Sequence, residues 1–336
     1  MTVTPVALES RPSGVAPGTA AADVLATDLT GLRAGVERAT DREVTRALTR
    51  AHPDLAELAA LLSAPAGARL EELAGVAHER TVRRFGRTVR LFAPLYLSNE
   101  CVSVCTYCGF SADNDIARRT LTMAELAAEG EELRRRGFRH VLLVSGEHAR
   151  IVSKDYLVDA VATLAPLLPS ISVEVQVWDV ATYRRLVGAG CQGLVVYQEA
   201  YDRGTYESVH LKGKKRNYDW RLAAPDRGAE AGMRRLGIGA LLGLHPDWTS
   251  EAIAVAAHAR ALIRRWWRCE VTIALPRLRP AAGYRPANEL CDRDFVQLLC
   301  ALRIVLPDVG LTLSTREAPQ FRDRLVALGV TTMSAG

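Results

Sequence analysis

The sequence predicts a closed (β/α)8 barrel with an N-terminal helical extension. Short apolar runs alternate with helical stretches along most of the 336 residues, which is typical of a parallel sheet covered by helices. The runs are rich in Val, Leu and Ile, as strands buried on both faces should be, and eight such units favour a closed barrel over an open sheet. The runs are Pro94–Leu97, Val141–Ser145, Ile171–Gln176, Leu194–Tyr197, Ile238–Leu244, Val271–Leu275, Leu311–Ser314 and Val330–Met333.

The chain before the barrel divides into an arm and a helical segment. Residues 1–27 are rich in Ala, Thr, Pro, Val and Gly, and we expect them to form a disordered arm. Residues 28–92 predict two or three helices, because leucines recur there at helical spacing. The barrel then extends over residues 93–336.

One helix of the barrel is marked at both ends. Thr122 and Glu125 have the spacing of a capping box, which predicts the start of a helix. Gly137 follows Arg136 and predicts its end, since glycine readily adopts the left-handed conformation that ends helices. This helix would follow the first strand.

Composition and charge exclude several classes of protein. With 49% hydrophobic and 24% charged residues the chain is globular, and without an apolar run of about 18 residues it predicts no transmembrane helix. The net charge of +5, from 43 basic and 38 acidic residues, is too mild for a nucleic-acid footprint, and only His210–Arg216 is densely basic. Seven cysteines are too few and too unevenly spaced for a disulfide scaffold.

Polar side chains follow seven of the eight predicted strands. In a (β/α)8 barrel the loops at the carboxyl ends of the strands carry the chemistry, so we expect these side chains to meet at one end. They are Cys101, Cys105, Cys108, Glu147, Glu174, Gln176, Gln198, Glu199, Arg277, Arg316, Glu317 and Ser334.

Three cysteines crowd into eight positions, at Cys101, Cys105 and Cys108. A tetrahedral zinc site takes four ligands, commonly as two C-x2-C pairs, and the sequence has neither a second pair nor a nearby histidine. Three thiolates on one loop fit a [4Fe–4S] cluster with one iron left open to bind and reduce a ligand. Structural zinc and inert buried cysteines are the weaker alternatives.

This C-x3-C-x2-C spacing resembles that of the radical S-adenosylmethionine (SAM) enzymes. The resemblance implies that the open iron of a [4Fe–4S] cluster binds SAM, and that one electron from the cluster cleaves SAM to methionine and a 5′-deoxyadenosyl radical. It places Tyr107 near the adenine, with simple packing as an equal alternative. It also makes Glu147 an acceptor for the SAM ammonium, with an exposed loop glutamate as the alternative.

Longer motifs resemble the aromatic amino-acid lyases of this superfamily, most closely the 2-iminoacetate synthases. These motifs are Pro94–Asn99, Cys105–Asn114, Tyr197–Tyr201, Val209–Lys215, Pro276–Pro280 and Ser314–Glu317. The resemblance implies cleavage of the Cα–Cβ bond of L-tyrosine to 2-iminoacetate (dehydroglycine) and p-cresol, for thiamine thiazole biosynthesis. It further implies thiazole synthase (ThiG) as a protein partner and reduced flavodoxin or ferredoxin as electron donor.

The same resemblance assigns roles to other side chains. Tyr96 matches a tyrosine that lines the amino-acid pocket, Arg316 the guanidinium that grips the substrate carboxylate, and Ser334 a serine near that carboxylate. Arg277 and Arg279 would support a carboxylate of SAM or substrate, with a structural ion pair as the alternative. Candidates for hydrogen bonds to the SAM ribose or methionine moiety are Glu174, Gln176, Gln198 and Glu199. For His210 and Lys212, a solvated basic face is favoured over a role near the tyrosine phenol.

Alternatives exist within and outside this chemistry. A tyrosine lyase of hydrogenase maturation or a tryptophan lyase would use the same cluster and cofactor. A non-catalytic iron–sulfur scaffold would need neither Glu147 nor Arg316, and a zinc-stabilised nucleic-acid binder would need a fourth ligand and a basic stripe.

Two departures from the lyase pattern are an extra Pro246 and the end of the chain after strand eight, which leads us to expect a truncated barrel. An iron–sulfur enzyme with free thiols predicts a cytoplasmic, reducing location.

Overall fold

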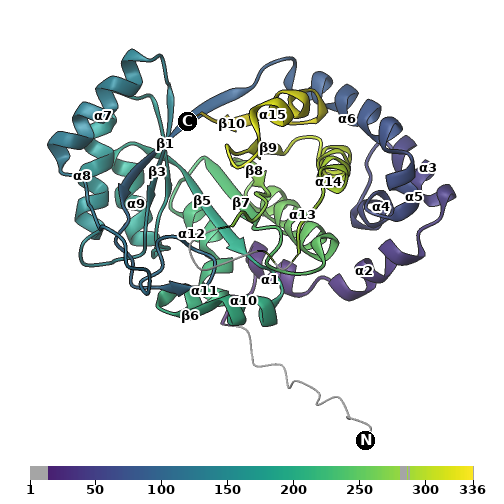
Figure 1. Ribbon diagram of the computed structural model, residues 1–336, viewed down its shortest axis with the longest axis horizontal. Coiled ribbons are helices and arrows are strands. Elements are labelled where there is room, and N and C mark those ends of the chain that lie inside the picture. The colour runs from purple at the N-terminus through teal and green to yellow at the C-terminus, as the bar shows by residue number, and fades with distance from the viewer. Residues whose placement is uncertain (1–13, 281–285, 287, 336) are drawn as a thin grey trace, which may run out of the picture.

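Eight parallel strands close into a barrel, as the apolar runs predicted (Figure 1). The computed structural model describes residues 14–280, 286 and 288–335. Around the barrel the strand order is β1-β10-β9-β8-β7-β5-β4-β3. The strands are β1 (Arg90–Ser98), β3 (His140–Ser145), β4 (Ser170–Glu174), β5 (Cys191–Glu199), β7 (Arg235–Ala240), β8 (Glu270–Ala274), β9 (Gly310–Leu313) and β10 (Thr332–Ser334).

The first strand closes the barrel by pairing on both of its edges. Leu91 is in register with Met333 of β10, and Tyr96 with Val144 of β3. All pairs in the barrel are parallel, so the carboxyl ends of the strands share one rim. Two short strands, β2 (Val104–Cys105) and β6 (His210–Lys212), form a separate antiparallel pair.

Helices cover the outside of the barrel. The one with the best sequence signals, α7 (Met123–Arg135), begins at Thr122 with the predicted capping box, and Gly137 adopts a φ of 86° just after it. The other helices of the barrel are α8 (Lys154–Leu164), α9 (Val180–Ala189), α10 (Arg203–Val209), α11 (Tyr218–Leu222), α12 (Ala224–Glu230), α13 (Trp248–Arg265), α14 (Asp292–Val305) and α15 (Pro319–Leu325). Among the described helices, none is both long and apolar enough to cross a bilayer.

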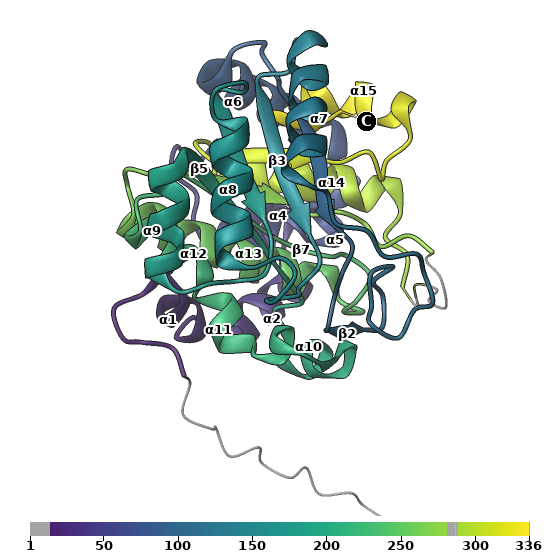
Figure 2. The same ribbon diagram turned by 90° about the vertical axis from the view of Figure 1, so that its left-hand side faces the viewer.

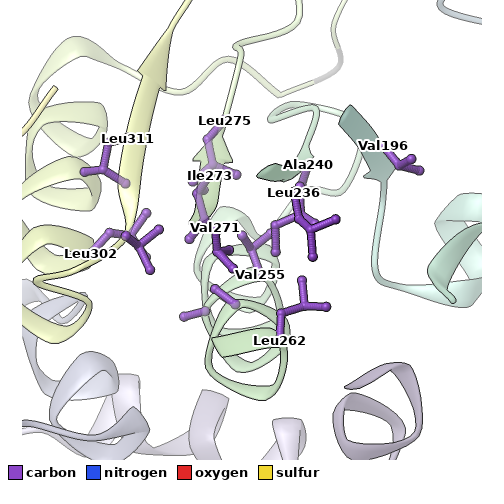
Figure 3. Close-up of a cluster of buried hydrophobic side chains, with 14 of the residues drawn as sticks. Val196, Leu236, Ala240, Val255, Leu262, Val271, Ile273, Leu275, Leu302 and Leu311 are labelled. Atoms are coloured by element: carbon purple, nitrogen blue, oxygen red, sulfur yellow. The ribbon is translucent and has the colours of Figure 1, made fainter. Parts of the chain in front are cut away.

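The main hydrophobic core lies between the strands and these helices. Figure 3 shows Val255 and Leu262 of α13 against Leu236 of β7 and Ile273 of β8, and each of the four is at most 1% exposed. Truncating one such side chain to alanine would cost about 2–5 kcal/mol, because the cavity left behind collapses only in part. Burial of these side chains therefore stabilises the part of the barrel wall that α13 covers.

The helical extension has more elements than predicted. Five helices lie between residues 29 and 85, where two or three were expected, and in Figure 1 they form an arc beside α13 and α14. They are α2 (Leu29–Arg38), α3 (Asp41–Thr49), α4 (Leu55–Leu61), α5 (Ala64–Ala68) and α6 (Leu70–Phe85). Short breaks separate α4, α5 and α6, and the Ser63 hydroxyl accepts a hydrogen bond that begins α5.

Part of the segment expected to be a disordered arm is a helix. Residues 1–13 lie outside the described part of the chain, but α1 (Ala20–Leu25) packs against α13. The carboxylate of Asp226 accepts hydrogen bonds from the amides of Ala20 (2.8 Å) and Ala21 (3.1 Å). These contacts span more than 200 residues of sequence, which is why local composition did not reveal them.

Candidate active site

The three clustered cysteines lie on a loop that follows β1 at the carboxyl rim of the barrel. Their loop includes β2, and Figure 2 shows β2, α10 and α11 at the same end of the molecule. The amide of Val102 donates to the carbonyl of Glu147 (2.9 Å), and that of Thr106 donates to the carbonyl of Val209 (3.0 Å). The loop is thus tied to the residues after β3 and to the start of β6.

All seven cysteines are free thiols, and those of the loop fit a cluster by the chemistry of their donors. Cys101 and Cys108 are half-buried, whereas Cys105 is buried, and burial raises the pKa of its thiol to about 12. Binding to a metal would deprotonate such a thiol. In the described part of the chain, no three His, Cys, Asp or Glu side chains are grouped to hold a single metal ion. The role of the three cysteines as ligands stays a prediction.

The other four cysteines do not all lie in the core. Cys191 and Cys300 are buried, and Cys269 is half-buried. Cys291 is exposed and lies at the start of α14, where its sulfur accepts a hydrogen bond from the amide of Asp294 (3.4 Å).

The end of β3 approaches the cysteine loop so closely that only glycine fits there. A Cβ atom on Gly146 would lie 2.3 Å from the carbonyl oxygen of Glu100 and 3.1 Å from the Cβ of Cys101. The amide of the next residue, Glu147, donates a hydrogen bond to the sulfur of Cys101 (3.4 Å). The sequence Gly146-Glu147 therefore connects the end of a barrel strand to the first cysteine.

The side chain of Glu147 is buried in a network of charges. Its carboxylate accepts hydrogen bonds from Arg221 (3.1 Å) and from the hydroxyl of Ser103 (3.3 Å). Since a carboxylate offers about four acceptor positions, these bonds leave capacity for a further donor. Its role toward the SAM ammonium stays a prediction.

Glu199 lies in the same network and takes an unusual backbone conformation, with a φ of 71°. The ammonium of Lys215 binds its carboxylate at 2.8 Å, and a guanidinium nitrogen of Arg221 lies at 3.8 Å. Burial acts to raise the pKa of Glu199, yet the two cations hold it below its ordinary value. Sequence reasoning missed Lys215 and Arg221. The basic run 210–216 contained a signal for Lys215, but nothing local marked Arg221, which lies on the short helix α11.

Tyr107 and His210 form a buried hydrogen-bonded pair. The hydroxyl of Tyr107 lies 2.8 Å from Nε2 of His210, whose Nδ1 lies 2.8 Å from the carbonyl oxygen of Tyr206. Burial lowers the pKa of His210 to about 3, so the ring is neutral: Nδ1 donates to the carbonyl, and Nε2 accepts from the phenol. The prediction that both residues belong to a solvated basic face is therefore wrong for His210, which is fully buried. It agrees with the exposure of Lys212.

Two glutamines near the carboxyl ends of β4 and β5 have buried polar atoms without partners. Among the described residues, Nε2 of Gln176 and Oε1 of Gln198 make no hydrogen bond. Glu174 ends β4, and burial together with the charge of Glu199 raises its pKa to about 7. Unsatisfied buried polar groups are costly, which fits a wall that receives a polar ligand.

The residues predicted to bind substrate lie on β1, on β10 and on the loop after β9. Tyr96 of β1 is 55% exposed, with its ring edge-on to Phe110 at 6.2 Å. The hydroxyl of Ser334 accepts a hydrogen bond from the amide of Thr315 (3.1 Å), which joins the end of β10 to the loop that bears Arg316. The guanidinium of Arg316 is exposed and makes no ion pair with the described residues. These three roles remain predictions.

Arg277 and Arg279 bind a buried carboxylate of the protein. Both guanidinium groups hold Glu317, which is 3% exposed. Arg277 also donates to the carbonyl oxygen of Leu290 (2.9 Å) and to Asp292 (2.7 Å), so each of its nitrogens has a partner. This arrangement favours the structural ion pair over the predicted support of a ligand carboxylate.

Comparisons with known proteins cover nearly the whole chain. A family model for the radical SAM superfamily matches residues 95–258, and one for the biotin and thiamin synthesis associated domain matches residues 274–336. The 2-iminoacetate synthase of Escherichia coli (strain K12) is 42% identical over 309 residues, which are 92% of this chain and 82% of that protein.

Two solved structures agree with this similarity. The FeFe-hydrogenase maturase HydG from Carboxydothermus hydrogenoformans aligns with a TM-score of 0.85 and 32% identity, over 94% of this chain and 75% of that one. Methylornithine synthase (PylB) aligns with a TM-score of 0.74 over 87% and 85% of the two chains. At 22% identity, the second supports the fold alone.

Proposed function

The chain belongs to the 2-iminoacetate synthase family of radical SAM enzymes, and from this premise we propose that it cleaves the Cα–Cβ bond of L-tyrosine to 2-iminoacetate and p-cresol. The similarity that carries the proposal covers 92% of the chain. The geometry supports it, because the cysteine loop and the loop of Arg316 both leave the same rim of the barrel.

One half of the rim suits a cluster and SAM. Cys101, Cys105 and Cys108 would hold three irons of a [4Fe–4S] cluster, and the fourth would stay open. When bound, the cluster and SAM supply an electron and a 5′-deoxyadenosyl radical. Glu147 would accept hydrogen bonds from the SAM ammonium, and the unpartnered Nε2 of Gln176 and Oε1 of Gln198 would form hydrogen bonds with the polar groups of SAM.

Three further residues complete that half. Tyr107 would lie against the adenine, held in place by its hydrogen bond to neutral His210. Glu174 and Glu199 would accept hydrogen bonds from the ribose or the methionine moiety. The ion pair with Lys215 keeps Glu199 ionised and fixed before any ligand arrives.

Residues on β1, on β10 and on the loop after β9 suit the amino acid. The free guanidinium of Arg316 would bind the substrate carboxylate through two parallel hydrogen bonds. Ser334 would orient the same carboxylate, because its hydroxyl can donate while it accepts from Thr315. Tyr96 would line the side of the pocket and exclude water from the radical reaction.

The proposed function also implies partners and a location. The product of the enzyme, 2-iminoacetate, would feed thiamine thiazole formation on a thiazole synthase, and a reduced flavodoxin or ferredoxin would supply electrons. The seven free thiols support a cytoplasmic location, because thiols persist in a reducing compartment.

Anaerobic turnover tests this proposal directly. The enzyme, reconstituted with iron and sulfide, is mixed with dithionite, SAM and either L-tyrosine or L-tryptophan, and p-cresol and 5′-deoxyadenosine are measured. We expect both products with tyrosine. A full cluster that yields no 5′-deoxyadenosine would refute the radical SAM chemistry, whereas 5′-deoxyadenosine without p-cresol would refute only the tyrosine assignment. Cleavage of tryptophan instead would favour the tryptophan lyases.

Variants assign the roles of the residues. Cys105→Ala should abolish the absorbance of the cluster. Arg316→Ala should keep the cluster and lose affinity for tyrosine. Its matched control is Arg324→Ala, which removes an exposed arginine that lies on α15, after the loop of Arg316.

A further inference from the structure

The lysines of this chain gather on one face. It has only four, at positions 154, 212, 214 and 215, and three of them lie within the segment 210–216. Lys215 turns inward to Glu199, while Lys212, Lys214 and Arg216 are exposed. Lys154 lies across a surface groove from this segment. The proposed reaction uses none of the cations Lys154, Lys212, Lys214 and Arg216.

This basic segment is attached directly to the cysteine loop. In the β2–β6 pair, Cys105 is the partner of His210, and Val104 is the partner of Lys212. Gly213 packs so tightly that a Cβ atom on it would lie 2.7 Å from the Cα of Ser103, midway between two of the cysteines. The rate of electron transfer falls steeply with distance, so a donor that reduces a cluster on this loop needs to bind close to the loop.

The surface beside this segment has the composition of a protein interface. A groove of about 800 Å3 is lined by Lys154, Trp178, Lys214, Arg216 and Trp220. The ammonium groups of Lys154 and Lys214 lie 5.3 and 5.8 Å from the ring centre of Trp178. Trp220 is 37% exposed, whereas Trp178 is 6% exposed and only contributes to the lining of the groove. An exposed aromatic side chain next to cations is typical of surfaces that bind other proteins.

The charge of this surface selects the partner. Lys212, Lys214 and Arg216 form no ion pair with the described residues, whereas Lys154 is neutralised by Asp179 at 2.9 Å. Of the acids that line the groove, Glu207 is the one without an ion pair in the described part of the chain. The exposed, uncompensated charge is therefore positive. Three free cations are too few to track a nucleic-acid backbone, but they complement an acidic protein.

We propose that this lysine face, formed by Lys154, Leu211, Lys212, Lys214, Arg216 and Trp220, docks a small acidic flavoprotein that donates single electrons. The proposal rests on the proposed function, because it requires a cluster on the cysteine loop. In the step, the anionic flavin hydroquinone would give up one electron and become the neutral semiquinone, and that electron would reduce a [4Fe–4S] cluster held by the cysteine loop from the 2+ to the 1+ state. The 51% exposed Leu211 supplies apolar contact next to the cysteine loop.

A double charge reversal, Lys214→Glu with Arg216→Glu, tests the docking site. Its matched control is Arg42→Glu with Arg87→Glu, which reverses two exposed arginines of the helical extension that form no ion pair with the described residues. The probe is flavodoxin. Calorimetry gives its Kd for the reconstituted enzyme at low and at about 0.3 M salt, a concentration that screens exposed charges. Stopped-flow absorbance gives the rate at which its hydroquinone reduces the cluster.

We expect the lysine-face variant to bind flavodoxin at least tenfold more weakly and to reduce its cluster correspondingly more slowly. The control should match the wild type, and wild-type affinity should fall with salt. With dithionite as a small reductant, all three proteins should form p-cresol at similar rates. An unchanged Kd in the lysine-face variant would overturn the proposal, as would an equal loss in the control. If flavodoxin reduces the cluster in the expected pattern but no protein forms p-cresol, the docking site stands and the proposed function fails.

Discussion

Gly146→Ala should disconnect the cysteine loop from the barrel. The new Cβ atom would lie 2.3 Å from the carbonyl oxygen of Glu100, whereas ordinary contacts of a Cβ atom begin near 3.4 Å. Backbone must therefore move by about 1 Å, and overpacking of this kind costs about 1–3 kcal/mol. The shift would also strain the hydrogen bond from the amide of Glu147 to the sulfur of Cys101, and loss of this bond would lower the stability by about 1 kcal/mol more.

The assay separates loss of the loop from loss of the fold. After anaerobic reconstitution, iron per chain and the absorbance of the cluster report on the loop, and thermal unfolding reports on the barrel. We expect less than half of the wild-type iron and a midpoint lowered by a few degrees. Gly109→Ala is the control: it lies next to Cys108, and a Cβ atom on it would have no neighbouring atom within 4 Å. Wild-type iron content in Gly146→Ala, or equal loss in Gly109→Ala, would refute the argument.

Three more predictions follow from the charges. Arg316→Ala should raise the KM for tyrosine at least tenfold without changing the cluster spectrum, and an unchanged KM would exclude it as the carboxylate ligand. Lys215→Met should destabilise the protein by about 3–5 kcal/mol in urea unfolding, because Glu199 loses its buried partner, and adding Glu199→Gln should restore part of the loss. Because the pKa of Glu174 is raised from 4.5 to about 7 in the folded state, that state holds a proton which the unfolded state loses near pH 4.5, so stability should fall between pH 4.5 and 7. Glu174→Gln should flatten this fall in urea titrations, and an identical slope would contradict the assignment.

Much of the fold could be predicted because its determinants are local. A buried parallel strand needs a short apolar run, and each of the eight runs became a strand of the barrel. The rule that loops at the carboxyl ends carry the chemistry likewise found the cysteine loop and Glu147. One strand was predicted two residues too long, because the run Ile171–Gln176 was expected to be a strand, whereas β4 ends at Glu174 and Gln176 lies in the loop that follows.

What could not be predicted depends on partners far away in the sequence. Nothing near Ala20 indicates that Asp226 will cap its helix. Arg277 was predicted to support the carboxylate of SAM or substrate, because a guanidinium suits a carboxylate. It binds instead the carboxylate of Glu317, which lies 40 residues away in the sequence. Buried ion pairs of this kind depend on the assembled tertiary structure, whereas periodicity in a sequence reports only on its own element.

The division of charge across the rim explains why two ligands would bind in one orientation. The half formed by β3, β4 and β5 holds three carboxylates, Glu147, Glu174 and Glu199, against two cations, Lys215 and Arg221. Burial and the charge of Glu199 raise the pKa of the unmatched Glu174, and a ligand with positive charge, such as SAM with its ammonium and sulfonium, would restore the balance. On the opposite half, Arg316 forms no ion pair in the described part of the chain; its charge acts to lower the pKa of Glu174, and its guanidinium would attract a carboxylate. A cationic cofactor and an anionic group of the substrate are thus drawn to different strands, which would leave the reacting atoms between them.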